Sequence, residues 1–164
     1  MRDAEFDYSL LSTWLSDPRV LEFYEGRDQP LSPEAAREKY SVRIMAEDHN
    51  TPCIVEHNEQ AIGYLQFYPA DEPDTWGIDQ FIGIPEKWNQ GLGTRTVKLM
   101  LRYLFDSKQA TRCTLDPRTT NTRAIRCYEK AGFHKVRLLP RHELHEGDVR
   151  DCWLMEALHL SHNQ

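Results

Sequence analysis

The segment Ile78–Phe105 constrains the fold of this chain more than any other part of the sequence. It starts with a short apolar run that ends at Pro85, and it continues through Gly91-Leu92-Gly93 into a helical pattern. The apolar residues of that pattern recur at the spacing of one face of an α-helix: Val97, Met100, Leu101, Leu104 and Phe105. The segment therefore predicts a strand, a glycine turn and a helix in direct succession.

The glycine turn before this helix has the chemistry of an anion site. A helix start presents free backbone N–H groups and the positive end of the helix dipole, and glycine allows close approach or a positive φ. The turn does not match a dinucleotide pattern, because Thr96 stands where a third glycine is required. It does not match a triphosphate loop either, because Thr94 and Arg95 follow Gly93. A plain turn and a phosphate site both stay open on this segment alone.

The composition sets the class of protein. A length of 164 residues with 40% hydrophobic residues predicts one globular domain over residues 1–164. The formal charge of −6 disfavours nucleic acid or an anionic membrane as a partner and favours a cationic one. There is no apolar run near 18 residues, and the N-terminal residues lack the features of a signal peptide. We therefore expect a cytoplasmic protein.

The cysteines and histidines do not form a metal-binding pattern. The four cysteines lie at long, irregular spacings, which favours reduced structural thiols: Cys53, Cys113, Cys127 and Cys152. His142 and His145 fall in a polar segment without a third ligand, so we expect them at the surface. The sequence predicts no metal site.

The order of predicted elements indicates a mixed α/β (α+β) sheet with helices packed on it. The expected helices cover residues 6–15, 19–24, 33–45, 94–107 and 123–131. The expected strands cover residues 51–57, 61–68, 78–84, 111–115, 133–139 and 151–158. The first two strands should form a hairpin, and residues 140–149 should form a polar loop.

A second motif follows the predicted strand at 111–115. It reads Asn121-x-x-Ala124-x-x-x-Tyr128-x-x-x-Gly132-Phe133. With the upstream glycine turn, it resembles the GNAT superfamily of acetyl-coenzyme A-dependent N-acetyltransferases, and the resemblance covers most of the chain. Three segments look most like aminoglycoside 6′-N-acetyltransferases: Gly77-Ile78-Asp79-Gln80, Gly91-Leu92-Gly93-Thr94, and Asp116-Pro117 with the motif that starts at Asn121.

This resemblance implies the GNAT fold, in which a central, mostly antiparallel twisted sheet contains a splayed pair of parallel strands. It implies acetyl-coenzyme A as co-substrate and no metal. A backbone N–H near Phe81 or Ile82 would bind the thioester oxygen, and Ile82 and Ile84 would lend backbone groups to the pantetheine arm. The pyrophosphate would be held by Asn89, Gln90, Gly91, Leu92, Gly93 and Thr94, and the pantetheine also by Asn121 and Ala124.

The resemblance also assigns two catalytic side chains. Asp79 would accept a proton from the amine, directly or through water, and Tyr128 would protonate the leaving thiolate. An ordinary tyrosine pKa near 10 keeps that proton available at neutral pH. Structural alternatives stay open: Asp79 as partner of an arginine, Tyr128 as a core residue, Asp116 as a turn residue and Asn121 as a helix cap.

The acidic loop at residues 71–76 is the sequence clue to the acceptor. It leads directly into Asp79, so we expect it to overhang the acceptor site. Carboxylates and aromatic rings would suit a polycationic amino sugar, and the candidates are Tyr24, Asp71, Asp74, Trp76, Asp79 and Asp116. The implied function is acetylation of an aminoglycoside 6′-amine, conferring resistance. The alternatives are another small amine, such as a polyamine or siderophore precursor, or a non-catalytic acyl-coenzyme A-binding module.

Two positions depart from the superfamily pattern. Trp88 stands three residues before the first glycine of the turn, where members often carry Arg or Gln. The pyrophosphate would then depend on backbone amides, Asn89, Gln90 and Thr94. The chain also begins at its first helix, where members usually have a preceding strand. Either that edge strand is missing or the start of the chain is truncated. An exposed sheet edge would favour pairing with another chain, which leaves a homodimer open.

Overall fold

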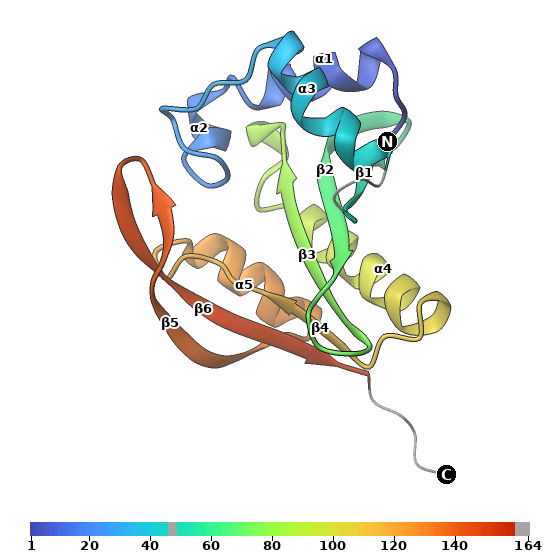
Figure 1. The fold of residues 1–164 in the computed structure, drawn as a ribbon, viewed down its shortest axis with the longest axis vertical. Coiled ribbons are helices and arrows are strands. Elements are labelled where there is room, and N and C mark those ends of the chain that lie inside the picture. Colours follow the sequence, from blue (N-terminus) through green and yellow to red (C-terminus); the bar gives the residue numbers. More distant parts are fainter. Residues whose placement is uncertain (46–48, 160–164) are drawn as a thin grey trace.

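A computed structural model describes residues 1–45 and 49–159. A six-stranded sheet crosses the molecule, with helices on both of its faces (Figure 1). The helices are α1 (Glu5–Trp14), α2 (Pro18–Leu21), α3 (Pro33–Ile44), α4 (Leu92–Ser107) and α5 (Thr122–Ala131). The strands are β1 (Thr51–His57), β2 (Gln60–Pro69), β3 (Thr75–Ile82), β4 (Arg112–Leu115), β5 (His134–His145) and β6 (Asp148–Leu158).

Local capping chemistry fixes where the helices begin. The side chains of Asp17, Ser32 and Asn121 each accept a hydrogen bond from a backbone N–H in the first turn of α2, α3 and α5. Gly132 ends α5 in the left-handed conformation, with φ of 114°. Helix α2 is shorter than the sequence predicts, because the backbone N–H groups of Phe23 and Tyr24 donate to the carbonyls three residues back, of Val20 and Leu21, instead of continuing the α-helical pattern.

The sheet has the order β1-β2-β3-β4-β6-β5. All neighbours are antiparallel except β3 and β4, which are parallel. The β3–β4 ladder pairs only three residues and ends at Gly77 opposite Thr114, although β3 stays paired with β2 as far as Ile82. The two parallel strands therefore separate beyond Gly77. The predicted splayed parallel pair is confirmed.

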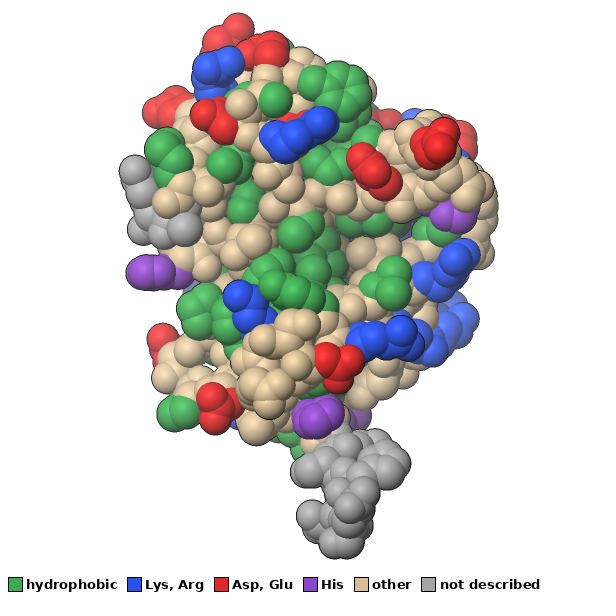
Figure 2. All heavy atoms as spheres, turned by 90° about the vertical axis from the view of Figure 1, so that its right-hand side faces the viewer, with side chains coloured by type: hydrophobic (Ala, Val, Ile, Leu, Met, Phe, Trp, Pro, Cys, Tyr) green, Lys and Arg blue, Asp and Glu red, His purple; other side chains and the backbone are tan. Residues whose placement is uncertain are grey.

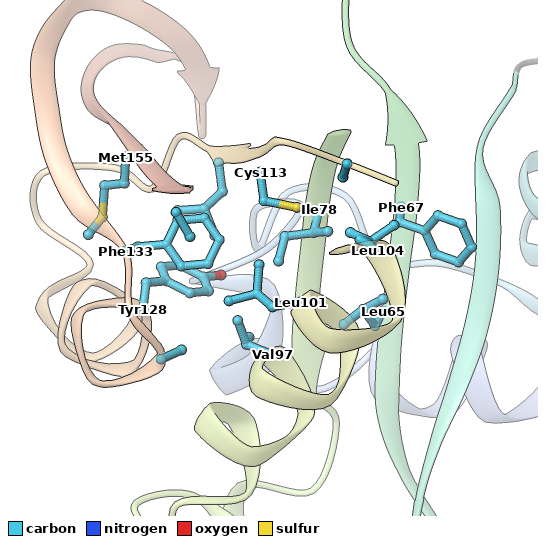
Figure 3. Packing of buried hydrophobic residues seen from close by; sticks show 14 of the residues in the cluster. Leu65, Phe67, Ile78, Val97, Leu101, Leu104, Cys113, Tyr128, Phe133 and Met155 are labelled. Carbon is cyan, nitrogen blue, oxygen red and sulfur yellow. The ribbon is translucent and has the colours of Figure 1, made fainter. Parts of the chain in front are cut away.

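Two hydrophobic clusters lie on opposite faces of the sheet. One packs α4 and α5 against β2, β3, β4 and β6, and Figure 3 shows it from close by. The other packs α1, α2 and α3 against the opposite face of β2 and β3. Because side chains of a strand alternate between faces, Ile78 enters the first cluster and Phe81 the second. Asp79 lies on the same face as Phe81.

The prediction of a loop at residues 140–149 is wrong. Strands β5 and β6 form a long hairpin whose ladder continues to His145 opposite Asp148. Pro140 lacks an N–H, and an irregularity between Leu139 and Glu143 accommodates it in the ladder. Both residues of the tight turn, Glu146 and Gly147, have positive φ. His145 is buried, which contradicts the expected surface position, whereas His142 is exposed.

Strand β3 also differs from its predicted span. It begins at Thr75, three residues earlier than expected, because Trp76 pairs with Pro69 of β2. It ends at Ile82, and the chain then forms a 3-10 turn at Pro85–Lys87. This shift places Trp76 in the sheet and Ile84 beyond the end of the strand.

The edges of the sheet are β1 and β5. Figure 2 shows the face that α4 and β1 occupy, where exposed hydrophobic side chains lie among charges of both signs. No helix of the described residues has the length and apolar character to cross a membrane. The single domain over residues 1–164, the homodimer and the cytoplasmic location stay predictions.

Candidate active site

A cavity of about 720 Å³ opens where β3 and β4 separate. Its wall comes from the segment after α2, from β3, from the turn before α4, from the end of β4 and from α5. It brings together most of the residues that the sequence singles out: Tyr24, Asp79, Phe81, Ile82, Asn89, Gly91, Leu92, Gly93, Thr94, Asp116, Asn121, Ala124 and Tyr128. The first and second motifs therefore meet at one site.

Asp79 reaches this cavity from the face of β3 that carries Phe81. Its Oδ2 accepts a hydrogen bond of 2.7 Å from Nε2 of Gln66, which lies opposite it on β2. Burial raises the pKa of Asp79, and the nearby Asp116 adds to this effect, whereas the hydrogen bond from Gln66 and the charge of Arg43 lower it. The net direction is upward, which suits a carboxylate that must accept a proton near neutral pH.

Gln66 connects Asp79 to two further side chains. Its Oε1 accepts hydrogen bonds from Tyr64 at 2.9 Å and from Nη1 of Arg43 at 2.7 Å. These donors fix the orientation of the amide, so that its NH₂ group faces Asp79. The sequence analysis did not identify Gln66, although an amide inside the apolar run of residues 61–68 is the same kind of signal as Asp79.

Tyr128 approaches the cavity from α5, on the other face of β3. Its ring packs against Phe133 with centroids 6.0 Å apart, and its hydroxyl points away from α5 toward Ile78 (Figure 3). The hydroxyl has no hydrogen-bond partner among the described residues, and Tyr128 lines the cavity. Burial raises the pKa of Tyr128, and nearby carboxylates act in the same direction. The phenol thus keeps its proton across the range in which enzymes work.

The glycine turn before α4 uses both properties that glycine allows, a positive φ and a close approach. Asn89 and Gly91 both have positive φ, of 60° and 75°. A Cβ at Gly93 would lie 3.3 Å from Sγ of Cys127, so glycine permits the close approach of α5. The N-terminus of the 16-residue helix α4 then faces the cavity with its free N–H groups.

Two predicted coenzyme contacts lie away from the cavity. The Gln90 side chain donates to the carbonyl of Glu86 on the exposed side of the turn. Ile84 lines a separate shallow groove beside Trp14 of α1. Ile84 follows the end of β3 at Ile82, where Gly83 packs against Trp14 of α1.

The free edge of β3 between Ile78 and Ile82 is the second feature suited to a coenzyme arm. Beyond Gly77 this edge has no strand partner on the side of β4, so alternate backbone N–H and C=O groups face the opening. One of these carbonyls is already used, because Nε1 of Trp88 donates to the carbonyl of Ile82 at 2.8 Å. Asn121 and Ala124 lie across the cavity at the start of α5, where the Asn121 side chain caps the helix.

Carboxylates also line the cavity. Asp116, at the end of β4, pairs with Nε2 of His142 from the β5–β6 hairpin at 2.7 Å. Glu143 of the hairpin and Glu25 also line the cavity. Glu143 pairs with Arg118, and Glu25 pairs with Lys39. The positions of His142 and Glu143 at the cavity were not predicted, because residues 140–149 were expected to form a loop.

The acidic loop does not overhang this site. Asp71 and Asp74 lie before the start of β3, whereas the cavity forms along its second half. At that far end Glu72 pairs with Arg112, the backbone carbonyl of Asp74 accepts from Thr111, and Trp76 packs on Phe67. The cavity lining begins on β3 at Ile78, so it gives no support to the predicted substrate contacts of Asp71, Asp74 and Trp76, which stay a prediction.

The residues around the cavity fit coenzyme A. The turn at 89–94 offers backbone N–H groups for a pyrophosphate, the free edge of β3 offers an extended backbone, and four cations line the same side: Lys87, Arg123, Arg126 and Lys130. The described residues contain no group of three or more His, Cys, Asp or Glu side chains suited to a metal ion, and all four cysteines are free.

Comparison with known proteins identifies the family. The family model for the acetyltransferase (GNAT) domain matches residues 3–140. The chain is 33% identical over 143 residues to an aminoglycoside N(6')-acetyltransferase type 1 of Klebsiella pneumoniae, covering 80% of this chain and 71% of that protein.

Solved structures agree with this assignment. The crystal structure of aminoglycoside acetyltransferase AAC(6')-Ib in complex with coenzyme A and kanamycin superposes with a TM-score of 0.79 and 30% identity, over 94% of this chain and 91% of the other. A spermidine N-acetyltransferase from Vibrio cholerae, in complex with coenzyme A and spermine, has the same fold at 18% identity with a TM-score of 0.79, over 93% and 90%. The chain belongs to the GNAT family of acetyl-coenzyme A-dependent N-acetyltransferases.

Proposed function

We propose that the protein acetylates the 6′-amine of an aminoglycoside and thereby confers resistance. The carrying observation is the charge distribution of the cavity. Four carboxylates, on β3, the end of β4, the hairpin and the segment after α2, line the cavity: Asp79, Asp116, Glu143 and Glu25. The last three pair with His142, Arg118 and Lys39, and Asp79 accepts a hydrogen bond from Gln66. A polycationic amino sugar complements such a surface, and the similarity to aminoglycoside acetyltransferases supports this acceptor class.

Acetyl-coenzyme A supplies an activated acetyl group as a thioester. In direct transfer within a ternary complex, Asp79 takes one proton from the acceptor ammonium, so that the freed nitrogen lone pair forms the new C–N bond. The nitrogen loses its second proton to solvent as the tetrahedral intermediate collapses to the amide, and Asp79 then releases its own proton to solvent. A backbone N–H near Phe81 or Ile82 holds the carbonyl oxygen as its negative charge grows. Tyr128 gives its proton to the sulfur as the C–S bond breaks, and bulk solvent later returns the proton lost by the phenol.

The surroundings of both groups support these roles. Burial and Asp116 favour the protonated form of Asp79, which gives it the basicity that proton transfer from an amine requires. The Tyr128 hydroxyl faces the cavity without a partner among the described residues, so its proton is free for transfer. Tyr24 packs on Phe81 at 4.6 Å between centroids and offers a ring surface on the acceptor side.

A free-thiol release assay with matched acceptors tests the proposal. The panel contains two aminoglycosides that differ only by an amine or a hydroxyl at the 6′ position, together with spermidine and N-hydroxylysine. We expect thiol release with the 6′-amine compound and none with its 6′-hydroxyl partner. Release with spermidine or N-hydroxylysine alone would assign another small-amine acceptor. Binding of acetyl-coenzyme A without turnover of any amine would indicate a binding module.

A further inference from the structure

Arg123 occupies an unusual position beside the glycine turn. Its guanidinium carbon lies 3.6 Å from the ring centroid of Trp88 and 4.6 Å from that of Phe23. The two rings meet edge to face, with centroids 6.3 Å apart and an interplanar angle of 87°. Two separate segments, the residues after α2 and the turn before α4, thus hold the guanidinium that the first turn of α5 carries.

The indole of Trp88 is itself fixed. Its Nε1 donates to the carbonyl of Ile82 at 2.8 Å, so the ring cannot turn its face away from Arg123 without losing that bond. The same bond leaves Trp88 without a free donor, since an indole has only one. Trp88 therefore serves as a support for a cation rather than as a ligand for an anion.

No carboxylate of the described residues forms an ion pair with Arg123, and the charge of Glu22 only partly opposes the lowering of its pKa by burial. Two buried or half-buried arginines beside the sheet are paired: Arg118 with Glu143, and Arg112 with Glu72 and Glu156. Arg123 has no hydrogen bond or ion pair to any described residue, although it is half-buried and burial lowers its pKa. A guanidinium removed from water with its N–H donors unfilled is costly unless a ligand accepts them.

The place of Arg123 limits what that ligand is. Arg123, Trp88 and the turn from Asn89 to Gly93 line the same cavity. We propose that Arg123, held between Phe23 and Trp88, is a binding residue for the pyrophosphate of acetyl-coenzyme A. Its planar fork supplies side-chain donors to an oxyanion whose other donors are the backbone N–H groups of the turn. This inference rests on coenzyme A use and is independent of the acceptor.

Calorimetric titration in the absence of acceptor tests the proposal with three probes: coenzyme A, dephospho-coenzyme A, which lacks only the 3′-phosphate, and S-acetylpantetheine, which has no phosphate. For Arg123→Ala, we expect about 10- to 100-fold weaker binding of both nucleotide probes and unchanged binding of S-acetylpantetheine. Arg123→Lys should recover part of the loss, because it keeps the charge but not the fork. Arg102→Ala, an exposed change of equal charge on α4, is the control.

Three outcomes would overturn the assignment. Equal losses for all three probes would mean that Arg123 only supports the fold. A loss confined to coenzyme A would place Arg123 at the 3′-phosphate. Unchanged binding of every probe would mean that the guanidinium has no ligand in the coenzyme. If wild-type protein binds coenzyme A but no aminoglycoside is acetylated, only the acceptor assignment fails. Chemical denaturation of Arg123→Ala, in parallel, shows whether the variant is folded.

Discussion

The side-chain amide of Gln66 donates to Oδ2 of Asp79 at 2.7 Å, across the β2–β3 ladder in which the two residues are direct partners. This contact leaves the proposed base hydrogen-bonded yet still facing the cavity. Burial raises the pKa of Asp79 and the amide opposes that rise. The pair therefore sets how readily the carboxylate accepts a proton, and two predictions follow from it.

Replacing Asp79 with Asn should lower kcat/KM by about 10²- to 10⁴-fold, the usual contribution of a general base. In the wild type, kcat/KM should fall as the pH falls through the raised pKa of Asp79, above the ordinary aspartate value near 4. A carboxylate with a raised pKa binds its proton more tightly in the folded state, so its ionisation destabilises the fold as the pH rises.

The free energy of unfolding of Asp79→Asn at neutral pH should therefore match or exceed that of the wild type. Denaturant titration and steady-state kinetics on the same preparation measure both quantities. Full activity of the variant would remove the base assignment. Lost activity with a large loss of stability would point to a structural role instead.

Replacing Gln66 with Met should move the acid limb of the kcat/KM profile to higher pH. The hydrogen bond from the Gln66 amide lowers the pKa of Asp79. Without that hydrogen bond, burial should raise the pKa of Asp79 further. Tyr64→Phe is the matched control, because it removes a donor to Oε1 of Gln66 but keeps the bond to Asp79. A limb at the same pH in both variants and the wild type would exclude any influence of Gln66 on the base.

Much of the fold follows from local signals in the sequence. Caps such as Ser32 and Asn121 act within one turn, so helix starts are readable from a few residues. The β5–β6 hairpin is different, because its outer half is mostly polar and exposed and Pro140 interrupts the strand pattern, although partners such as Glu143 and Arg150 are close in sequence. That pairing brings His142 and Glu143 to the cavity, so the missed hairpin also hid these residues.

Site residues could be predicted where a sequence motif specifies them. They could not be predicted where the answer depends on which end of a strand faces the cavity. Asp79 and Tyr128 converge as the two motifs imply. The acidic loop precedes Asp79 in sequence, but a strand advances about 3.3 Å per residue and carries the loop to its opposite end. The contacts of Trp88 could not be predicted from the sequence either, because its partners Phe23 and Arg123 come from segments far apart in the chain.

Replacing both Asp71 and Asp74 with Asn should leave kcat and KM within about twofold of the wild-type values, as for other exposed changes away from a site. Neither side chain lines the cavity. Steady-state kinetics with the best aminoglycoside of the panel measure this. A clear rise in KM would restore the loop as part of the acceptor site.

Replacing Asp116 with Asn should raise KM for a cationic acceptor by about fivefold, since an exposed ion pair contributes up to about 1 kcal/mol. The side chain is 44% exposed, and its pairing with His142 leaves it at the cavity wall. Salt should raise KM more for the wild type than for the variant, because screening removes an attraction that the variant lacks. Equal salt dependence would mean that Asp116 does not contact the acceptor charge.

Replacing Tyr128 with Phe should lower kcat by about 10²-fold or more while the fold is kept, because the change removes only the hydroxyl. The ring still packs on Phe133, and the hydroxyl has no partner to lose among the described residues. Since burial raises the pKa of Tyr128, deprotonation of the phenol should not produce a basic limb in the wild-type profile below pH 10 or so.

A coenzyme analogue whose leaving thiol is more acidic supplies the decisive comparison for Tyr128. Such a thiolate departs without a proton, so the deficit of Tyr128→Phe should shrink with it if the phenol acts as general acid. Asp79→Asn is the matched control, because its deficit concerns the amine and should be the same with both thioesters. An undiminished deficit for Tyr128→Phe would show that the tyrosine positions substrates rather than protonating the sulfur.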